Sequence, residues 1–383
     1  MKKVINYGKQ SIDNDDINAV VEVLKSDYLT QGSKTQEFEI SLAKYCNAKY
    51  AVVLNSGTSA LHAAYYALGL SKNDEFITTP LTFVATSNAG IYLGAKPIFS
   101  DIENDTGNID VAKIENKITK KTKLLVPVHY AGHPADMEQI YKIAKKYNLS
   151  VVEDASHAIG SKYKNKIIGS CKYSDITTFS FHPVKHITTG EGGAILTNNK
   201  ELYEKILMFR THGITKKIEK KLEIIGNWYY EMQNLGYNYR MTDIQAALGI
   251  SQLQKIDVFI EKRKRIVSLY RKAFAENEFF DIPAEKKYAK SAYHLYPIRL
   301  KDKYIHKRKE IFGNLRKNNI WVQVHYIPVH TQPYYKKHFK YNLGDFPVAE
   351  NFYQRIISLP MYPAMRESDI QYVIKTVLNT INY

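Results

Sequence analysis

From residue 50 to residue 197, short apolar runs alternate with stretches of helical periodicity. The apolar runs predict strands at Tyr50–Leu54, Glu75–Thr79, Lys96–Ser100, Lys123–Val128, Ser150–Glu153, Ile176–Phe179 and Ala194–Thr197. Helices are predicted over 56–70 and 83–93, and a further helix, capped by Asp110, is expected before the fourth strand. Strands that alternate with helices form a mostly parallel sheet covered on both faces. The pattern therefore predicts an α/β fold.

The pattern changes after about residue 240. The next predicted elements are one bent helix or two helices over Thr242–Asn277, strands at Tyr293–Leu300 and Trp321–Val324, and a terminal helix at Glu367–Ile381. The 383 residues are also more than one average domain needs. We therefore expect a large domain of residues 1–250, including the N-terminal segment, and a smaller C-terminal α/β domain of residues 251–383.

Composition excludes several classes of protein. Apolar residues make up 44% and charged residues 24%, close to a globular average and unlike a disordered or fibrous chain. Two cysteines, Cys46 and Cys171, cannot form a disulfide framework and suit a reducing cytosol. No apolar run is long enough for a membrane span, and the N-terminus has no export signal. We expect a cytoplasmic protein without a membrane partner.

The net charge of +16 favours acidic partners such as phosphorylated metabolites. Lysine is spread along the whole chain, and neither a zinc-finger spacing nor a basic stretch interleaved with aromatic residues accompanies it. A solvated basic surface explains the charge better than a nucleic-acid site. We expect no nucleic-acid partner.

One lysine lies in an unusual setting. A predicted strand runs into the segment Ser180–Gly193, where Lys185 is followed by three glycines and preceded by Pro183. Glycine and proline favour tight turns and a close approach of the backbone. A lysine that is partly desolvated in such a turn has a lowered pKa and can form a Schiff base with a carbonyl. Lys185 is therefore a candidate catalytic residue.

Asp154 follows an apolar strand at the point where parallel sheets meet their ligands. Taken alone, it is more readily explained as a helix cap. Together with Lys185 it is more informative, because both residues follow neighbouring predicted strands and could reach one pocket. A carboxylate there could pair with a protonated heterocycle nitrogen.

The segment Asn55–Leu61 joins a strand to a helix. Its helix start offers backbone N–H groups and hydroxyls, which together can bind an anion. The same residues are also common helix caps, so the signal is weak by itself. It gains weight because the Lys185 and Asp154 segments already suggest a phosphorylated cofactor.

These segments together resemble pyridoxal phosphate (PLP) enzymes of the aspartate aminotransferase fold, fold type I, and more narrowly the DegT/DnrJ/EryC1/StrS family of nucleotide-sugar aminotransferases. The matching segments are Thr30–Gly32, Asn55–Leu61, Pro80–Thr86, Glu153–Ala158, the Lys185 segment and Gly236–Ala247. They occur in order over nearly the whole chain, so a chance match is not expected.

The resemblance implies roles for the cofactor. Lys185 would hold PLP as a Schiff base and move protons, and Asp154 would pair with the pyridine nitrogen, so these two are the expected catalytic residues. The expected cofactor-binding residues are Gly57, Thr58, Ser59, Phe83, Asp154, His157, Ser180, Lys185 and Asn238. Phe83 would stack on the ring, and His157 would bond the cofactor hydroxyl. Gly57, Thr58 and Ser180 would hold the phosphate.

Further roles concern the substrate and the partner subunit. The expected substrate-binding residues are Gln31, His182, Arg240, His325 and Tyr326. Asn238 would reach the phosphate of the neighbouring subunit, so the resemblance implies a homodimer with shared active sites. Without the resemblance, we would interpret Phe83 as a core residue, His157 as a helix histidine with its hydrogen bonds made within the protein, and Arg240 as a member of a surface ion pair.

Two histidines four residues apart, His129 and His133, could suggest a metal site. Gly132 and Pro134 break any helix that would place both on one face. We therefore expect no metal.

Within the family, the motifs Asp154–Ala158, Phe179–His182 and Gln323–Tyr326 are most similar to those of members of the pseudaminic acid pathway. This implies amination of a UDP-linked 4-keto-6-deoxy-N-acetylhexosamine with glutamate as the amino donor. The same chemistry on the D-configured sugar of the bacillosamine and legionaminic acid routes is the alternative. Sugar-dehydrating relatives carry histidine in place of the lysine, so Lys185 argues against them. A non-catalytic sensor or scaffold with this fold is a further alternative.

Overall fold

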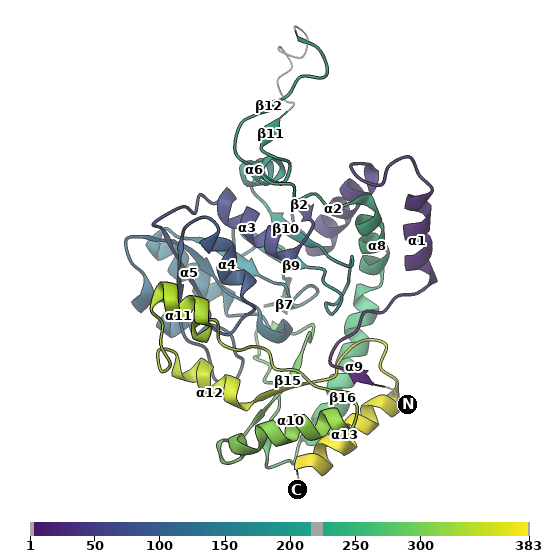
Figure 1. Cartoon of the computed structure of the whole chain (residues 1–383), viewed down its shortest axis with the longest axis vertical. Helices are drawn as coiled ribbons and strands as arrows, with labels where there is room; N and C mark the ends of the chain where they lie inside the picture. The colour runs from purple at the N-terminus through teal and green to yellow at the C-terminus, as the bar shows by residue number, and fades with distance from the viewer. Residues whose placement is uncertain (1–3, 216–224, 382–383) are drawn as a thin grey trace.

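The computed structural model describes residues 4–215 and 225–381, and its centre is a seven-stranded sheet (Figure 1). The strand order is β2 (Tyr50–Leu54), β10 (Gly193–Thr197), β9 (Ile176–Ser180), β6 (Ser150–Asp154), β5 (Thr122–Val126), β3 (Glu75–Thr78) and β4 (Lys96–Phe99). Strand β10 is antiparallel to both of its neighbours, and the other pairings are parallel. The α/β fold with a mostly parallel sheet is confirmed.

Helices cover both faces of this sheet, and they are α2 (Ser33–Cys46), α3 (Gly57–Ala67), α4 (Ala85–Ile91), α5 (Met137–Tyr147), α6 (Lys200–Arg210) and α8 (Asp243–Gln254). A further helix, α1 (Asn14–Leu24), packs on the outer side of α8. Side chains of successive strand residues point to opposite faces. Val53 and Val151 therefore pack with α2, α5 and α8, whereas Val52 and Val152 pack with α3 and α6. Burial on both faces explains why these strands are continuous apolar runs.

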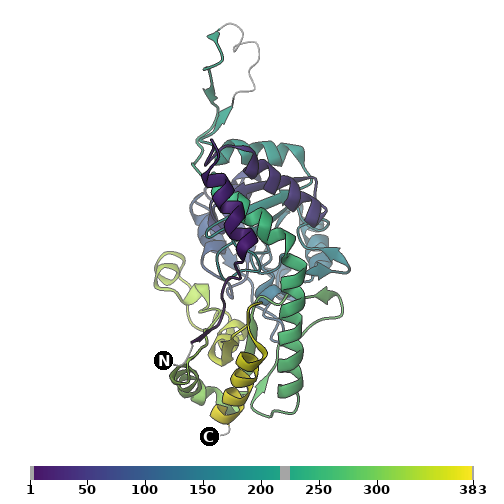
Figure 2. The same cartoon turned by 90° about the vertical axis from the view of Figure 1, so that its right-hand side faces the viewer.

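A long helix, α9 (Ile256–Phe274), runs from the sheet towards the C-terminal part of the chain (Figure 2). That part contains β13 (Phe280–Asp281), β15 (Tyr296–Leu300), β17 (Ile356–Leu359), α10 (Arg308–Lys317), α11 (Pro333–Phe339), α12 (Pro347–Arg355) and α13 (Glu367–Ile381). It has its own apolar core, in which Tyr296, Ile298 and Val373 are buried. Residue 250 lies inside α8, and the division into residues 1–250 and 251–383 stays a prediction.

Short strands also pair outside the central sheet. They are β1 (Ile5–Asn6) with β16 (Ile320–Trp321), β7 (Lys162–Tyr163) with β8 (Lys166–Ile167) and β14 (Ala289–Lys290), and β11 (Ile214–Thr215) with β12 (Glu231–Met232). The β11–β12 pair projects from the body of the molecule (Figure 1). The β1–β16 pair brings the N-terminal segment against the C-terminal part.

Several predicted elements differ from the structure, and the strand predicted at Tyr293–Leu300 begins only at Tyr296. The helix expected after Asp110 is only a pair of 3₁₀ turns, Val111–Lys113 and Glu115–Lys117, although Asp110 does cap the first turn. The strand predicted at Trp321–Val324 is reduced to Ile320–Trp321, which pairs with β1, whereas Gln323 forms only an isolated bridge to Ser358 of β17. The long helical stretch from residue 242 is two helices, α8 and α9, that meet at Lys255.

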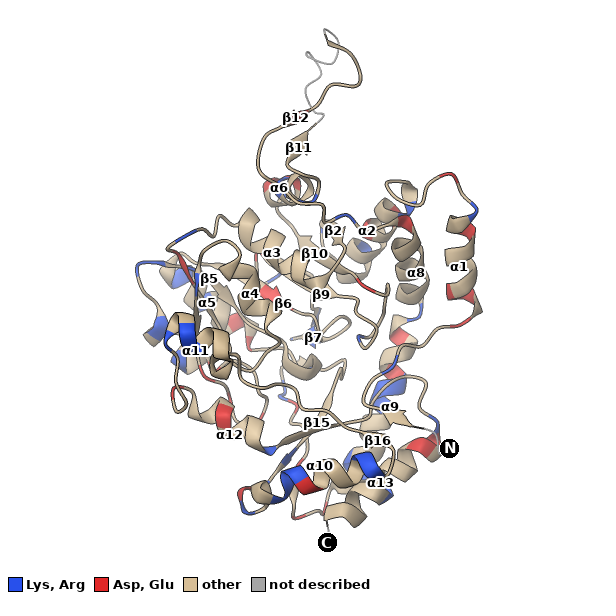
Figure 3. Cartoon of the chain, viewed as in Figure 1, with Lys and Arg blue, Asp and Glu red and all other residues tan. Residues whose placement is uncertain are grey.

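Figure 3 shows lysine and arginine distributed over many helices and loops, with acidic residues between them. Across residues 4–215 and 225–381, no helix has both the length and the apolar character that a membrane crossing requires.

Candidate active site

A cavity of about 460 Å³ lies where β6 and β9 end. Its lining comprises Tyr7, Ser56, Gly57, Thr58, Leu61, Thr82, Phe83, Ala85, Thr86, Val128, Asp154, Ser156, His157, Ser180, His182, Val184, Lys185, Glu191, His294, His325 and Tyr326. Ligands of parallel sheets bind at the carboxyl ends of the strands, and this cavity has that position. The fold therefore gathers segments from both halves of the sequence around one pocket.

Lys185 belongs to the turn that follows β9. The turn is held by backbone hydrogen bonds from Lys185 N to His182 O (2.9 Å) and from Phe181 N to Gly192 O (2.9 Å). Burial lowers the pKa of the Lys185 amine to about 8, and the negative charge of Asp154 acts in the opposite direction. A substantial fraction of the amine is therefore neutral near physiological pH and able to attack a carbonyl.

Asp154 is the last residue of β6 and is buried. Its Oδ2 accepts a hydrogen bond from the Thr86 hydroxyl (2.7 Å), and its Oδ1 accepts one from the Ser156 hydroxyl (2.7 Å). Because β6 and β9 are parallel neighbours, Asp154 and the Lys185 turn emerge at the same sheet edge. This agrees with the sequence argument that the two residues could reach one pocket.

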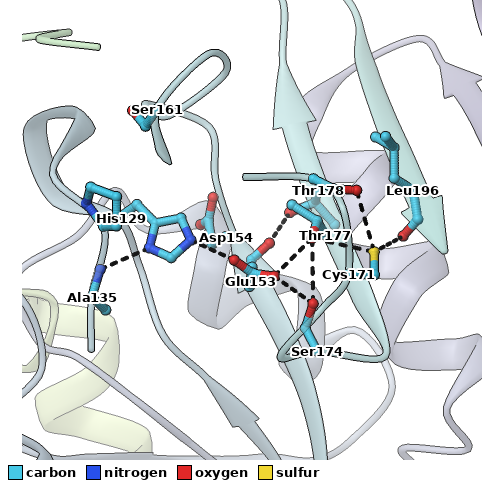
Figure 4. A network of polar contacts seen from close by, with 12 residues as sticks. His129, Ala135, Glu153, Asp154, Ser161, Cys171, Ser174, Thr177, Thr178 and Leu196 are labelled. Atoms are coloured by element: carbon cyan, nitrogen blue, oxygen red, sulfur yellow. Dashed lines mark hydrogen bonds and ion pairs between the residues drawn. The ribbon is translucent and has the colours of Figure 1, made fainter. Parts of the chain in front are cut away.

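The neighbouring carboxylate, Glu153, is buried in a separate network (Figure 4). It accepts hydrogen bonds from the hydroxyls of Ser174 (2.5 Å) and Thr177 (3.0 Å), and it pairs with His129 Nε2 (2.8 Å). Since His129 Nδ1 accepts from the Ala135 N–H (3.1 Å), the ring proton lies on Nε2 and is donated to Glu153. The ring of His129 is therefore a hydrogen-bond partner of Glu153. In the described part of the chain, no group of three His, Cys, Asp or Glu side chains is placed to hold a metal ion.

The N-terminus of α3 forms one wall of the cavity. The Ser56 hydroxyl caps the N–H of Ser59 (3.0 Å), so the N–H groups of Gly57 and Thr58 are left without an intrahelical acceptor. A Cβ atom on Gly57 would lie 2.9 Å from the Cβ of Ser180, so only glycine allows these two segments to approach this closely. The result is an anion-binding wall of helix N–H groups and hydroxyls.

Histidines surround the Lys185 side of the cavity. His157 Nε2 shares a hydrogen bond with the Tyr326 hydroxyl (3.0 Å), while its Nδ1 is buried without a partner. The ring of His294 packs on that of His157 with 4.3 Å between centroids. Burial, reinforced by the charge of Lys185, lowers the pKa of His157 well below its usual value and that of His325 to about 3. Both imidazoles are therefore neutral at pH 7.

The structure brings most of the predicted site residues together. The predicted residues that line the cavity are Gly57, Thr58, Phe83, Asp154, His157, Ser180, His182, Lys185, His325 and Tyr326. Those that do not line it are Gln31, Ser59, Asn238 and Arg240. Ser59 is buried in the capping box of α3, whereas Asn238 is exposed and lies beside Asn55 of the same chain.

Sequence reasoning assigned no role to several other lining residues. Tyr7 and His294 come from segments far from the recognised motifs, and only the fold places them at the cavity. Thr86 and Ser156 do lie inside two of those motifs. A signal for them was available, since hydroxyls close to a buried carboxylate tend to bond it.

The chemical groups that line the cavity suit PLP. It offers an amine for the aldehyde, a buried carboxylate for the ring nitrogen and a helix N-terminus for the phosphate. Phe83 is 58% exposed and lines the cavity, so its flat ring is available for stacking. The unpartnered Nδ1 of His157 is a buried polar atom that a ligand can satisfy.

Comparisons with known proteins agree with this chemistry. A UDP-4-amino-4,6-dideoxy-N-acetyl-beta-L-altrosamine transaminase of Campylobacter jejuni is 45% identical over 99% of this chain and 98% of its own length. The structure of Helicobacter pylori PseC, an aminotransferase involved in the biosynthesis of pseudoaminic acid, superposes with a TM-score of 0.93 at 39% identity, covering 99% of this chain and 100% of PseC.

A protein of Streptococcus pneumoniae assigned as a sugar aminotransferase was solved in its PLP form, and it matches with a TM-score of 0.92 at 30% identity over 99% of both chains. The family comparison covers residues 10–378. Full-length similarity to aminotransferases, together with a cavity that fits the cofactor, identifies a PLP-dependent enzyme of fold type I. The chain belongs to the DegT/DnrJ/EryC1/StrS aminotransferase family.

Proposed function

We propose that this aminotransferase moves an amino group from glutamate to the C4 ketone of a UDP-linked 4-keto-6-deoxy-N-acetylhexosamine. The product would be UDP-4-amino-4,6-dideoxy-N-acetyl-β-L-altrosamine, an intermediate of the pseudaminic acid route. The observation that carries this proposal is the full-length similarity to a transaminase named for that product. The cavity supports it, because the lysine and aspartate that the chemistry needs line one pocket.

Lys185 is assigned the covalent attachment of the cofactor and the proton transfer. Its amine is neutral often enough that it would react with the cofactor's aldehyde, and as a free base its Nζ would accept a proton from the substrate carbon. When bound, PLP supplies an electron sink for the bond that breaks at that carbon. The same amine would return a proton when the sugar ketone accepts the amino group.

The other proposed contacts with the cofactor follow from where each residue lies in the cavity. Asp154 would hold the ring nitrogen in its protonated form, and Phe83 would cover the ring face. Gly57, Thr58 and Ser180 line the wall that suits a phosphate, whereas Ser59 would act indirectly by capping the same helix. His157, with its free Nδ1, is the group proposed to bond the cofactor hydroxyl.

His182, His325 and Tyr326 line the cavity and are proposed to contact the sugar, and both histidines have pKa values lowered by burial. Neutral imidazoles can donate or accept hydrogen bonds to hydroxyl and acetamido groups without adding charge. Gln31 and Arg240 are proposed to reach the substrate from outside this wall.

We further propose a homodimer with shared sites. Large apolar side chains are exposed near the projecting β11–β12 pair: Trp228 is 78%, Leu235 74% and Met232 61% exposed. Exposed apolar groups gathered in this way mark interaction surfaces. Asn238 follows the same segment and is proposed to reach the phosphate of the partner's cofactor.

Shared sites can be tested by mixing two inactive variants. Lys185→Ala lacks the amine, and Asn238→Ala lacks the contact that is proposed to cross the interface. If sites are shared, mixed dimers contain one site with both residues intact, and about a quarter of the wild-type activity should return. The proposal is wrong if the enzyme is monomeric by light scattering, or if mixing restores no activity.

The substrate is tested by offering the purified enzyme glutamate with each C5 epimer of the UDP-4-keto-6-deoxy sugar. NMR of the amino product should identify the L-altro product. Preference for the D-configured epimer would favour the bacillosamine or legionaminic acid routes instead. Turnover of neither sugar, without formation of a covalent PLP adduct, would favour a non-catalytic sensor. The cytoplasmic location remains part of this proposal and rests on the low cysteine content.

A further inference from the structure

The carboxylate of Asp154 accepts three hydrogen bonds from two residues. Oδ2 accepts from the Thr86 hydroxyl (2.7 Å), and Oδ1 accepts from both the hydroxyl (2.7 Å) and the backbone N–H (3.2 Å) of Ser156. Thr86 lies on α4 and Ser156 in the turn after β6, so the two hydroxyls approach from different elements. Both residues line the cavity together with Asp154.

The direction of these bonds can be derived. An ionised carboxylate only accepts, so the single hydroxyl hydrogen of Thr86 points to Asp154. The oxygen of Thr86 must then accept from the hydroxyl of Thr82, which lies 2.8 Å away. A short chain of donors, Thr82 to Thr86 to Asp154, therefore ends on the carboxylate.

The bonds also distinguish the two carboxylate oxygens. Each oxygen has two lone pairs, and both lone pairs of Oδ1 are used by Ser156. Oδ2 has only the donor from Thr86 and keeps one lone pair. Oδ2 is therefore the oxygen left to accept a proton donor from a ligand in the cavity.

The backbone does not need these hydroxyls to keep its course. Asp154 N donates to Pro127 O (2.9 Å), and Asp154 O accepts from His129 N (3.1 Å), so the strand end is already fixed. The adjacent carboxylate of Glu153 has its own donors, His129, Ser174 and Thr177, and uses neither Thr86 nor Ser156. The two hydroxyls therefore fix the orientation of the Asp154 carboxylate rather than the course of the backbone.

We propose that Thr86 and Ser156 are positioning residues for Asp154, which hold its carboxylate with Oδ2 free to face the cofactor's ring nitrogen, so that this nitrogen retains its proton. Donors to a carboxylate favour its charged form. Without them the carboxylate can turn away, and the ring nitrogen would lose the acceptor that holds its proton. This inference rests on the role proposed above for Asp154.

The test uses holoenzyme loaded with PLP labelled with nitrogen-15 in the ring. In Thr86→Val and in Ser156→Ala, the ring-nitrogen resonance should move from the protonated towards the neutral pyridine position. The affinity of each apoenzyme for PLP should fall about tenfold, because each variant loses a hydrogen bond to a charged group. Thr86→Ser keeps the hydroxyl and should restore both readouts.

The matched control is Thr78→Val. Thr78 is buried, and its hydroxyl donates to Val126 O (2.8 Å) without contacting Asp154, so the same substitution there should leave the resonance unchanged. An unchanged resonance in both Thr86→Val and Ser156→Ala, or an equal shift in Thr78→Val, would overturn the inference.

Asp154→Asn separates this inference from the function on which it rests. If Asp154→Asn leaves the resonance at the protonated position, the role proposed for Asp154 itself is wrong. If Asp154→Asn moves the resonance and the two hydroxyl variants do not, only the role of Thr86 and Ser156 is refuted.

Discussion

Asp154 and Lys185 line one cavity, and the carboxylate of Asp154 partly offsets the effect of burial on the pKa of the Lys185 amine. Burial nevertheless prevails and leaves that pKa at about 8, well below the ordinary value of a lysine. The site thus keeps a usable nucleophile beside a fixed negative charge. Both the stability of the apoenzyme and its reaction with the cofactor depend on this balance.

The first prediction concerns the pH dependence of stability. Because the folded pKa of Lys185 is about 8 and the unfolded pKa is higher, the unfolded state binds more protons above pH 8. The penalty for the buried charge is fully present below that pH and is lost as the pH rises towards the unfolded pKa.

The Lys185→Met apoenzyme lacks this penalty and should be more stable at pH 7 by about 3 kcal/mol, with the difference disappearing above about pH 11. Chemical denaturation of both apoenzymes across this range measures the difference. An equal stability at every pH would show that the amine is not desolvated.

The second prediction concerns capture of the cofactor. Only the neutral amine attacks an aldehyde, so the rate at which apoenzyme binds PLP covalently should rise with pH and level off above about pH 8. Stopped-flow absorbance of apoenzyme mixed with PLP gives this profile. A rate that still rises steeply at about pH 10 would indicate an ordinary lysine pKa.

The third prediction concerns the network behind β6. In Glu153→Gln, the amide nitrogen would face the hydroxyls and the His129 N–H that now donate to the carboxylate, so at least one buried donor loses its partner. We expect the free energy of unfolding to fall by about 2–4 kcal/mol. The matched substitution Glu22→Gln, on an exposed surface, should change it by less than about 0.5 kcal/mol.

The fourth prediction concerns a partly buried ion pair. Arg210 Nη1 lies 2.6 Å from Glu39 Oε1 and also donates to Val53 O (2.7 Å), so it joins α6, α2 and the edge strand β2. Arg210→Ala should lower the free energy of unfolding by about 3 kcal/mol, because the partly buried carboxylate of Glu39 loses its cation and keeps only the Val53 N–H (3.0 Å) as a donor. Lys25→Ala, which breaks the exposed pair with Glu22, should have almost no effect. Equal effects of the two substitutions would contradict this assignment.

Much of the fold could be predicted because both faces of the sheet are buried. Burial makes the strands continuous apolar runs, and the predicted bounds of Tyr50–Leu54 and Ser150–Asp154 lie within one residue of the observed ones. The short segments were harder to predict. The 3₁₀ turns after Asp110 and the two-residue strand at Ile320 depend on tertiary contacts rather than on local periodicity.

In the site, too, some residues could be predicted from local pattern and others depend on tertiary contacts. Lys185, Asp154 and the start of α3 could be predicted because strand ends in a parallel sheet meet at one edge. His294 and Tyr7 could not, since they reach the cavity only through packing of the C-terminal part and the N-terminal segment. The roles of Gln31, Asn238 and Arg240 remain predictions, because these residues lie outside the cavity wall of the single chain.

The covalent bond between Lys185 and the cofactor is tested by borohydride reduction of the holoenzyme followed by peptide mapping. A pyridoxyl group on the peptide that contains Lys185, and its loss in Lys185→Met, are the expected results. A label on another lysine, or no label in an enzyme that still binds PLP and transfers amino groups, would contradict the mechanism proposed here.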